Sequence, residues 1–188
     1  MDIKDLRVKL FADGADINTM KEIYNKGIVK GFTTNPSLMK KAGVKDYLTF
    51  ISDAVTAIPN LSLSFEVFAD DFDTMKREAE LISSMGKNIM VKIPITNSKG
   101  ESSIPLIHKL SKDGINLNIT AVFTLEQVSK ILSVLDDSTH NYISIFAGRI
   151  ANTGIDPEPI MYTAAKECHL KNNVELLWAS SREVFNIV

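Results

Sequence analysis

The sequence predicts an α/β fold, a (β/α)8 TIM barrel whose eighth strand and helix are either absent from this chain or encoded in a part that the given sequence does not include. Short apolar segments alternate strictly with longer segments of helical periodicity along the 188 residues. Strands that alternate with helices in this way pair in parallel through right-handed crossovers, which leaves an open doubly wound sheet or a closed barrel. No phosphate loop of the G-x-G-x-x-G or Walker type follows the first strand, so the barrel is favoured over the usual open sheets.

Seven segments are expected to be strands because each is short, apolar and bounded by turn residues. The clearest is the run at 88–96, which is closed by Pro94 and by a turn at 97–100. It lacks the alternation of a half-exposed strand, so we expect it to be buried on both faces. In chain order, the expected strands are residues 8–13, 28–34, 61–67, 88–96, 115–119, 142–146 and 174–179.

The segments between these strands carry apolar residues three and four positions apart, which is the spacing of amphipathic helices. The expected helices are residues 17–24, 44–58, 72–82, 104–110, 125–135, 157–171 and 183–188. A barrel that stops there would expose two sheet edges. Either the C-terminal part is missing from this sequence or another chain closes the gap, and we favour the first explanation.

Composition predicts one soluble globular domain over residues 1–188, because 45% of the residues are hydrophobic and 23% are charged. A net charge of -2 argues against nucleic acid or an anionic membrane as the partner. The single cysteine, Cys168, excludes an internal disulfide and a four-cysteine metal site, and it suits a reducing compartment. The charged N-terminus lacks the apolar core of a secretory signal, so we expect a cytoplasmic protein.

Lys92 lies in the middle of the apolar run at 88–96. Burying an unpaired ammonium group is so costly that the amine tends to lose its proton, which leaves a nucleophile of the kind that forms Schiff bases. The alternative is a lysine near a strand end that extends to solvent or pairs with a carboxylate.

Polar residues occur at or just past the C-terminal end of each expected strand, which is where the active site of such a barrel forms. Each has a simpler interpretation: Asn35 could only cap a helix, Asn118 could face solvent, and an arginine could be a surface charge. Their recurrence around one candidate amine is therefore the stronger signal. The candidates are Asp13, Thr33, Asn35, Glu66, Lys92, Asn118, Thr120, Ser144, Arg149, Ser180 and Arg182.

These residue types together fit Schiff-base chemistry. A neutral lysine adds to a ketone and loses water to give an imine, which withdraws electrons so that a carbon–carbon bond nearby can break or form. Asp13 would take the proton from the hydroxyl group on the carbon that leaves, and Glu66 with Thr120 would hold the water. The residues suited to hold a phosphate are Arg149, Ser180 and Arg182.

Five segments resemble, in order and at the usual spacing, motifs of the transaldolase family and its relatives, the fructose-6-phosphate aldolases. They are TTNPS at 33–37, VKIPIT at 91–96, GINLNIT at 114–120, SIFAGR at 144–149 and ASSR at 179–182. The resemblance implies an eight-stranded barrel that acts on a sugar phosphate in carbohydrate metabolism, as in the pentose phosphate pathway, and that forms a homo-oligomer. It implies no metal or organic cofactor, since the lysine is the electron sink.

The resemblance also implies a role for each candidate residue. Lys92 would form the Schiff base, Asp13 would be the acid–base carboxylate, and Glu66 with Thr120 would surround the catalytic water. The residues implied to bind the substrate are Thr33, Asn35, Asn118, Ser144, Phe146, Arg149, Ser180 and Arg182.

Two positions favour a transferase over an aldolase within the family. The aldolase relatives carry glutamine where this chain has Glu66 and tyrosine where it has Phe146. The resemblance therefore implies transfer of a dihydroxyacetone unit from a ketose phosphate to an aldose phosphate. The alternatives are a lyase that releases free dihydroxyacetone and a non-catalytic sugar-phosphate binding protein. The segment at 11–16 and Ser181 depart from the family pattern, and both bear on which sugar is bound.

Overall fold

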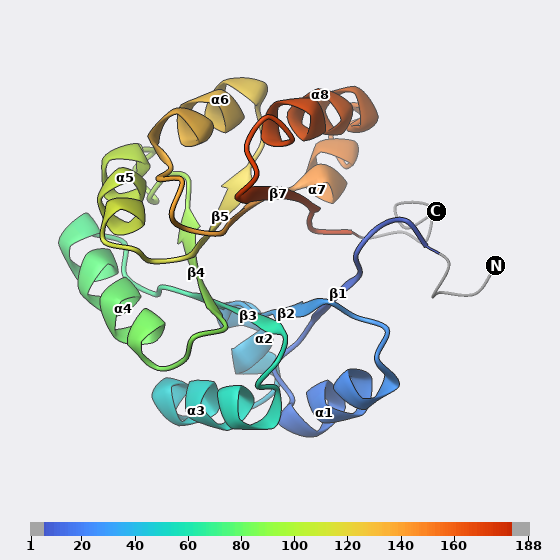
Figure 1. The fold of residues 1–188 in the computed structure, drawn as a ribbon, viewed down its shortest axis with the longest axis vertical. Coiled ribbons are helices and arrows are strands. Elements are labelled where there is room, and N and C mark those ends of the chain that lie inside the picture. Colours follow the sequence, from blue (N-terminus) through green and yellow to red (C-terminus); the bar gives the residue numbers. More distant parts are fainter. Residues whose placement is uncertain (1–5, 182–188) are drawn as a thin grey trace. The chain divides into compact units, whose positions relative to one another are not determined.

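The computed structural model describes residues 6–181, so Arg182 and the expected helix at 183–188 lie outside the described residues. Strands and helices alternate as the sequence predicts, and the strands follow one another in the sheet in chain order (Figure 1). The strands are β1 (Phe11–Asp13), β2 (Gly31–Thr33), β3 (Ser62–Glu66), β4 (Ile89–Pro94), β5 (Leu117–Val122), β6 (Asn141–Ile145) and β7 (Val174–Trp178). The predicted fold class, a parallel β/α barrel type, is confirmed, with seven strands among residues 6–181.

The helices between the strands are α1 (Ile17–Lys26), α2 (Pro36–Lys41), α3 (Tyr47–Ala57), α4 (Phe72–Ser84), α5 (Ile104–Lys112), α6 (Leu125–Val134), α7 (Ala147–Ala151) and α8 (Glu158–Cys168). Two of them, α2 and α7, are not predicted by the sequence. They have six and five residues, which is too short to establish a helical period. Within residues 6–181, no helix combines the length and the apolar character needed to cross a membrane.

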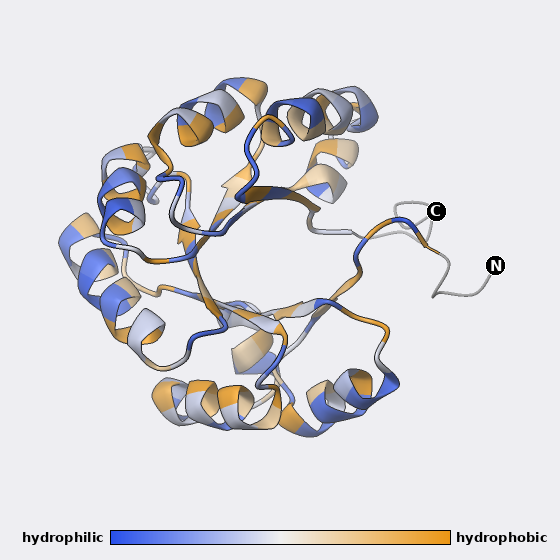
Figure 2. Ribbon diagram, in the orientation of Figure 1, coloured by the Kyte–Doolittle hydropathy of each residue, from blue (hydrophilic) through white to orange (hydrophobic). Residues whose placement is uncertain are grey.

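The chain divides into two compact units. Unit 1 comprises Met1–Phe68 and Arg77–Val91, and unit 2 comprises Ala69–Lys76 and Lys92–Val188. In each unit, individual helices carry both polar and apolar residues, as expected of amphipathic helices that cover a sheet (Figure 2).

In unit 1, the parallel strands β1, β2 and β3 separate polar side chains from the apolar core. Phe65 of β3 is 1% exposed and packs against Phe50 of α3, with ring centroids 6.0 Å apart. Because side chains alternate along a strand, Ser64 and Glu66 lie on the opposite face of the sheet. Asp13 pairs with Thr33, and Thr33 with Ser64, so these polar residues share that face.

In unit 2, the strands β5, β6 and β7 pair in parallel, and α6, α7 and α8 lie along one side of them (Figure 1). Ile119 and Ile143 pair in register and are fully buried, which anchors the core. The residue after β4 joins this sheet, because the Ile95 amide donates to the Thr120 carbonyl at 3.0 Å. The C-terminal end of β4 therefore lies beside β5.

Asparagine side chains connect the loops that precede the strands of unit 2. Asn141 is fully buried, and its Oδ1 accepts from the Leu117 amide at 3.1 Å. Its Nδ2 donates to the Thr139 carbonyl at 3.2 Å and to the Thr139 hydroxyl at 2.9 Å. Asn173 donates to the same carbonyl at 2.7 Å. These bonds satisfy buried backbone groups that the sheet leaves without partners.

Cys168, on α8, is expected to react slowly with thiol reagents in the folded protein. It is fully buried, and this burial raises the pKa of its thiol to about 11, with a smaller contribution from the nearby Glu167 carboxylate. The reactive thiolate is therefore scarce near neutral pH. The neutral thiol contributes to stability below the pKa of an unfolded cysteine, about 8.5, and this contribution is lost as the pH rises towards 11.

The measurement is the rate of reaction with a chromogenic disulfide at pH 8, in buffer and then in denaturant. A full equivalent of thiol should appear only on unfolding. Rapid labelling of the native protein would contradict the expectation, and Cys168→Ser provides the blank.

Candidate active site

In unit 1, the structure brings Asp13 and Thr33 together. Asp13 is the last residue of β1, and its Oδ1 accepts a hydrogen bond from the Thr33 hydroxyl at 2.7 Å. The two residues pair in register on adjacent strands, so the contact follows from the strand ends that the sequence places side by side. This bond fixes the orientation of a carboxylate whose side chain is exposed.

Asn35 follows β2 and caps helix α2. Its Oδ1 accepts from the Leu38 amide at 3.0 Å, and Pro36 occupies the first turn. Asn35 therefore caps a helix, as the simpler interpretation predicts, and whether this is its only role is a separate question. The cap uses only the side-chain oxygen, so substrate binding through the amide nitrogen stays a prediction.

Glu66 ends β3 and is half-buried. Its main-chain oxygen accepts from the Tyr47 hydroxyl at 2.7 Å. Burial raises the pKa of Tyr47, and the carboxylates of Glu66 and Glu78 raise it further, so this hydroxyl stays protonated as a donor. Sequence reasoning missed Tyr47, although a tyrosine at the start of an amphipathic helix needs a partner for its hydroxyl group.

Lys92 is 7% exposed and lies in β4. The next residue, Ile93, is fully buried, and it points to the opposite face of the strand. The prediction of a strand buried on both faces is thus confirmed. A lysine that extends into bulk solvent does not fit this degree of burial, so that half of the alternative is wrong, whereas pairing with a carboxylate stays an alternative.

Asn118 and Ser144 form a buried pair on β5 and β6. The Ser144 hydroxyl donates to Asn118 Oδ1 at 2.7 Å, and the two residues are 4% and 0% exposed. Thr120, two positions after Asn118 on the same strand, is 2% exposed and shares its face. The alternative in which Asn118 belongs to a solvated strand face is therefore wrong.

A β-bulge follows Thr120. The register between β5 and β6 shifts between Ile119 and Val122, and Ala121 has a φ of +57°. A residue with a Cβ atom in this left-handed conformation costs on the order of 1 kcal/mol. Bulges re-aim the neighbouring side chains, so this one helps to set the direction of Thr120.

Phe146, Arg149 and Ser180 lie past the ends of β6 and β7. The Arg149 guanidinium lies over the Phe146 ring, 5.5 Å from its centroid. Ser180 follows β7 and has a φ of +61°. The Gly148 amide of α7 donates a hydrogen bond to the carbonyl of Ala179, the residue before Ser180, at 3.4 Å. The end of β7 and the start of α7 are therefore neighbours. Arg182, the other predicted phosphate ligand, lies outside the described residues.

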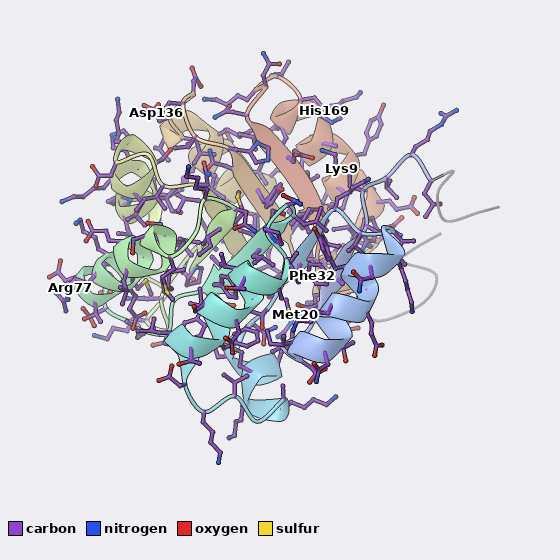
Figure 3. All side chains as sticks on the ribbon, turned by 60° about the horizontal axis from the view of Figure 1, so that its bottom comes forward. Lys9, Met20, Phe32, Arg77, Asp136 and His169 are labelled. Atoms are coloured by element: carbon purple, nitrogen blue, oxygen red, sulfur yellow. The ribbon has the colours of Figure 1, made fainter. Side chains whose placement is uncertain are left out.

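Each unit also contains a cavity. The cavity of unit 1 has a volume of about 270 Å³ and lies between β1, α1, β2 and α2. Met20 and Phe32, both labelled in Figure 3, are among the residues that line it. The cavity of unit 2, about 520 Å³, has an acidic lining. Its residues are Asp70, Asp71, Phe72, Asp73, Asn97, Lys99 and Glu101. In the described part of the chain, no three His, Cys, Asp or Glu residues are grouped to hold a metal.

Parallel strands that alternate with helices define a β/α barrel class of protein. In this chain the fourth strand carries a buried lysine. The chain belongs to the transaldolase/fructose-6-phosphate aldolase family, whose model matches residues 10–188. This match confirms the resemblance indicated by the five motifs.

Relatives named "Probable transaldolase" match at about one third identity. That of Thermoanaerobacter sp. (strain X514) is 35% identical over 149 residues, which is 79% of this chain and 64% of the relative. That of Halalkalibacterium halodurans is 32% identical over 176 residues, which is 93% of this chain and 78% of the relative. The chain thus spans a little under two thirds of the first relative's length.

Among solved structures, a dihydrodipicolinate synthase family protein from Coccidioides immitis is similar with a TM-score of 0.56 and 11% identity. The similarity covers 89% of this chain and 59% of that one, and at this identity it supports the fold alone.

Proposed function

We propose that this chain is a transaldolase-type enzyme that moves a dihydroxyacetone unit from a ketose phosphate to an aldose phosphate. The observation that carries the proposal is Lys92, a lysine that is 7% exposed on β4 within the VKIPIT motif of a family member. A lysine with so little exposed surface is positioned to attack the carbonyl group of a bound substrate, as a solvated surface lysine is not.

The reaction would proceed in two halves around Lys92. Its Nζ attacks the ketose carbonyl carbon, water leaves, and a protonated imine forms. Asp13 then takes the proton from the β-carbon hydroxyl group, the bond between the α and β carbons breaks, and the first aldose departs. The enamine that remains attacks the acceptor aldehyde, Asp13 returns the proton, and water hydrolyses the new imine.

The other residues would bind the substrate or the water. Glu66 and Thr120 would hold the water that leaves and returns. Asn118 and Ser144, already hydrogen-bonded to each other, would bind hydroxyl groups of the dihydroxyacetone unit. Further sugar contacts are proposed for Thr33, Asn35 and Phe146, and phosphate contacts for Arg149, Ser180 and Arg182.

Phe146 favours transfer over release. Free dihydroxyacetone forms only when the enamine carbon takes up a proton, and a phenylalanine side chain has no proton to donate. A hydroxyl group at this position would supply one. The sugar-phosphate substrate and the homo-oligomer implied by the resemblance belong to the same proposal. The cytoplasmic location, expected from the single cysteine and the charged N-terminus, belongs to it too.

Trapping with borohydride tests the proposal. Incubation with fructose 6-phosphate and borohydride should reduce the imine to a stable amine, and mass spectrometry of the peptides should place the adduct on Lys92. Lys92→Met is the control that cannot be trapped. No adduct with any ketose phosphate would contradict the proposal.

Omission of the acceptor separates transferase from lyase. A transferase should release one equivalent of the first aldose per active site and then stop, because the enamine has no partner. Continued turnover without acceptor would identify the lyase alternative instead. An adduct-free protein that nevertheless binds sugar phosphates would support the non-catalytic alternative.

A further inference from the structure

In unit 2, the side chain of Phe146, past the end of β6, contacts both Phe123, past the end of β5, and Arg149. The ring of Phe123 meets the ring of Phe146 edge to face, with centroids 5.7 Å apart and an interplanar angle of 70°. The same Phe146 ring lies under the Arg149 guanidinium at 5.5 Å. Phe146 therefore connects an exposed aromatic residue to an exposed cation.

The backbone explains why the two rings meet. The Phe146 amide donates to the carbonyl of Val122, the residue before Phe123, at 2.9 Å. The Phe123 amide donates to the Gln127 side chain at 2.8 Å, within the capping box that begins α6. Phe123 is 37% exposed, yet the peptide group between Val122 and Phe123 is hydrogen-bonded through both its carbonyl and its amide. Its position is therefore fixed by the fold and not by packing in the core.

We propose that Phe123 is a positioning residue for phosphate binding. It holds the Phe146 ring in the orientation on which the Arg149 guanidinium rests, and it thereby sets where that cation meets the substrate's phosphate. The inference rests on the proposed function, in which Arg149 binds the phosphate, and Phe123 lies outside the five segments that match the family motifs.

The physical basis is the quadrupole of the aromatic ring. Edge-to-face pairs are favourable because the positive edge of one ring meets the negative face of the other. A guanidinium over a ring face is attracted to the same negative charge. An arginine on a flexible side chain loses less entropy on binding phosphate when its position is already restricted. Loss of the Phe123 ring should therefore weaken phosphate binding without changing the chemistry at Lys92.

The first test is calorimetric binding of inorganic phosphate and of fructose 6-phosphate to the full chain. Phe123→Leu should weaken both by about two- to five-fold, the scale of one exposed cation–π contact. Phe123→Tyr retains the ring and should bind as the wild type does. Phe68→Leu is the matched control, because Phe68 is also exposed and also packs edge to face, against Tyr47 at 4.8 Å.

A double-mutant cycle isolates the route through the arginine. In the Arg149→Met background, Phe123→Leu should cause no further loss of phosphate binding, because the residue that it positions is gone. With fructose, which lacks the phosphate, the KM should be the same for the wild type and Phe123→Leu. The kcat with fructose 6-phosphate should also change little.

A second readout needs no ligand. The Arg149 side-chain protons should show an upfield ring-current shift in the NMR spectrum of the wild type and of Phe123→Tyr, and a smaller shift in Phe123→Leu. Wild-type phosphate affinity in Phe123→Leu, or an equal loss in the Arg149→Met background, would overturn the inference. A wild type that forms the Lys92 adduct but binds no phosphate would overturn it too. Absence of the Lys92 adduct would instead contradict the proposed function.

Discussion

Lys92→Met is expected to lower kcat by roughly 10⁴- to 10⁶-fold, the range seen when a member of a covalent catalytic unit is removed. Methionine matches the length and apolar stem of lysine but offers no amine, so no imine can form. Because Lys92 is only 7% exposed, methionine retains most of the buried volume of the side chain. A coupled sugar-phosphate assay measures the loss of activity, and circular dichroism checks that the variant is folded.

Lys130→Met is the matched control for Lys92→Met. The Lys130 side chain is 59% exposed and pairs with Glu126 one helical turn earlier, at 2.6 Å. Exposed pairs of this kind contribute little, about 0.3–0.5 kcal/mol. Lys130→Met should therefore keep full activity. If Lys92→Met retained a tenth of the wild-type rate, Lys92 would not be the nucleophile.

The sequence predicts those features of the site that follow from strand position. The apolar run around Lys92 is enough to predict its burial, because a strand in which polar and apolar residues do not alternate has no solvent-exposed face. The meeting of Asp13 and Thr33 follows from the adjacency of β1 and β2 once the parallel order is accepted. Substrate binding by the remaining candidate residues stays a prediction.

Features that depend on backbone dihedrals or on tertiary contacts could not be predicted. The strand expected at 115–119 runs instead to Val122, because the bulge at Ala121 extends the pairing, and no residue pattern announces a positive φ at alanine. The first strand begins at Phe11 and not at residue 8, since Val8 is 62% exposed. An apolar residue does not reveal from sequence alone whether a partner strand reaches it.

The role of Phe123 was hidden for a similar reason. A phenylalanine directly after an apolar strand and before a helix cap resembles any residue at a strand end. Only the register that places Phe146 beside Val122 brings the two rings together.

Asn141→Ala is expected to destabilise the protein by about 2–3 kcal/mol. The truncation leaves the Leu117 amide without its side-chain acceptor and the Thr139 carbonyl with one donor fewer, at a position that is fully buried. A buried backbone donor cannot turn to find another partner, so its full desolvation cost is felt. For a chain of this size the melting temperature should fall by roughly 4–12 °C. Unfolding in urea, followed by circular dichroism, measures the change.

Asn118→Ala separates a structural asparagine from a functional one. Asn118 is as deeply buried as Asn141 and lies on the adjacent strand, but the donor to its Oδ1 is the Ser144 hydroxyl, which can rotate towards another acceptor. Asn118→Ala should therefore lower the free energy of unfolding by less than Asn141→Ala does. It should lower kcat/KM by roughly 10²-fold, because a group that orients the substrate is gone. Folded Asn141→Ala protein, assayed well below its melting temperature, should retain near wild-type kcat. The opposite pattern, with activity lost at Asn141 and stability lost at Asn118, would show that the candidate site had been assigned to the wrong end of the strands.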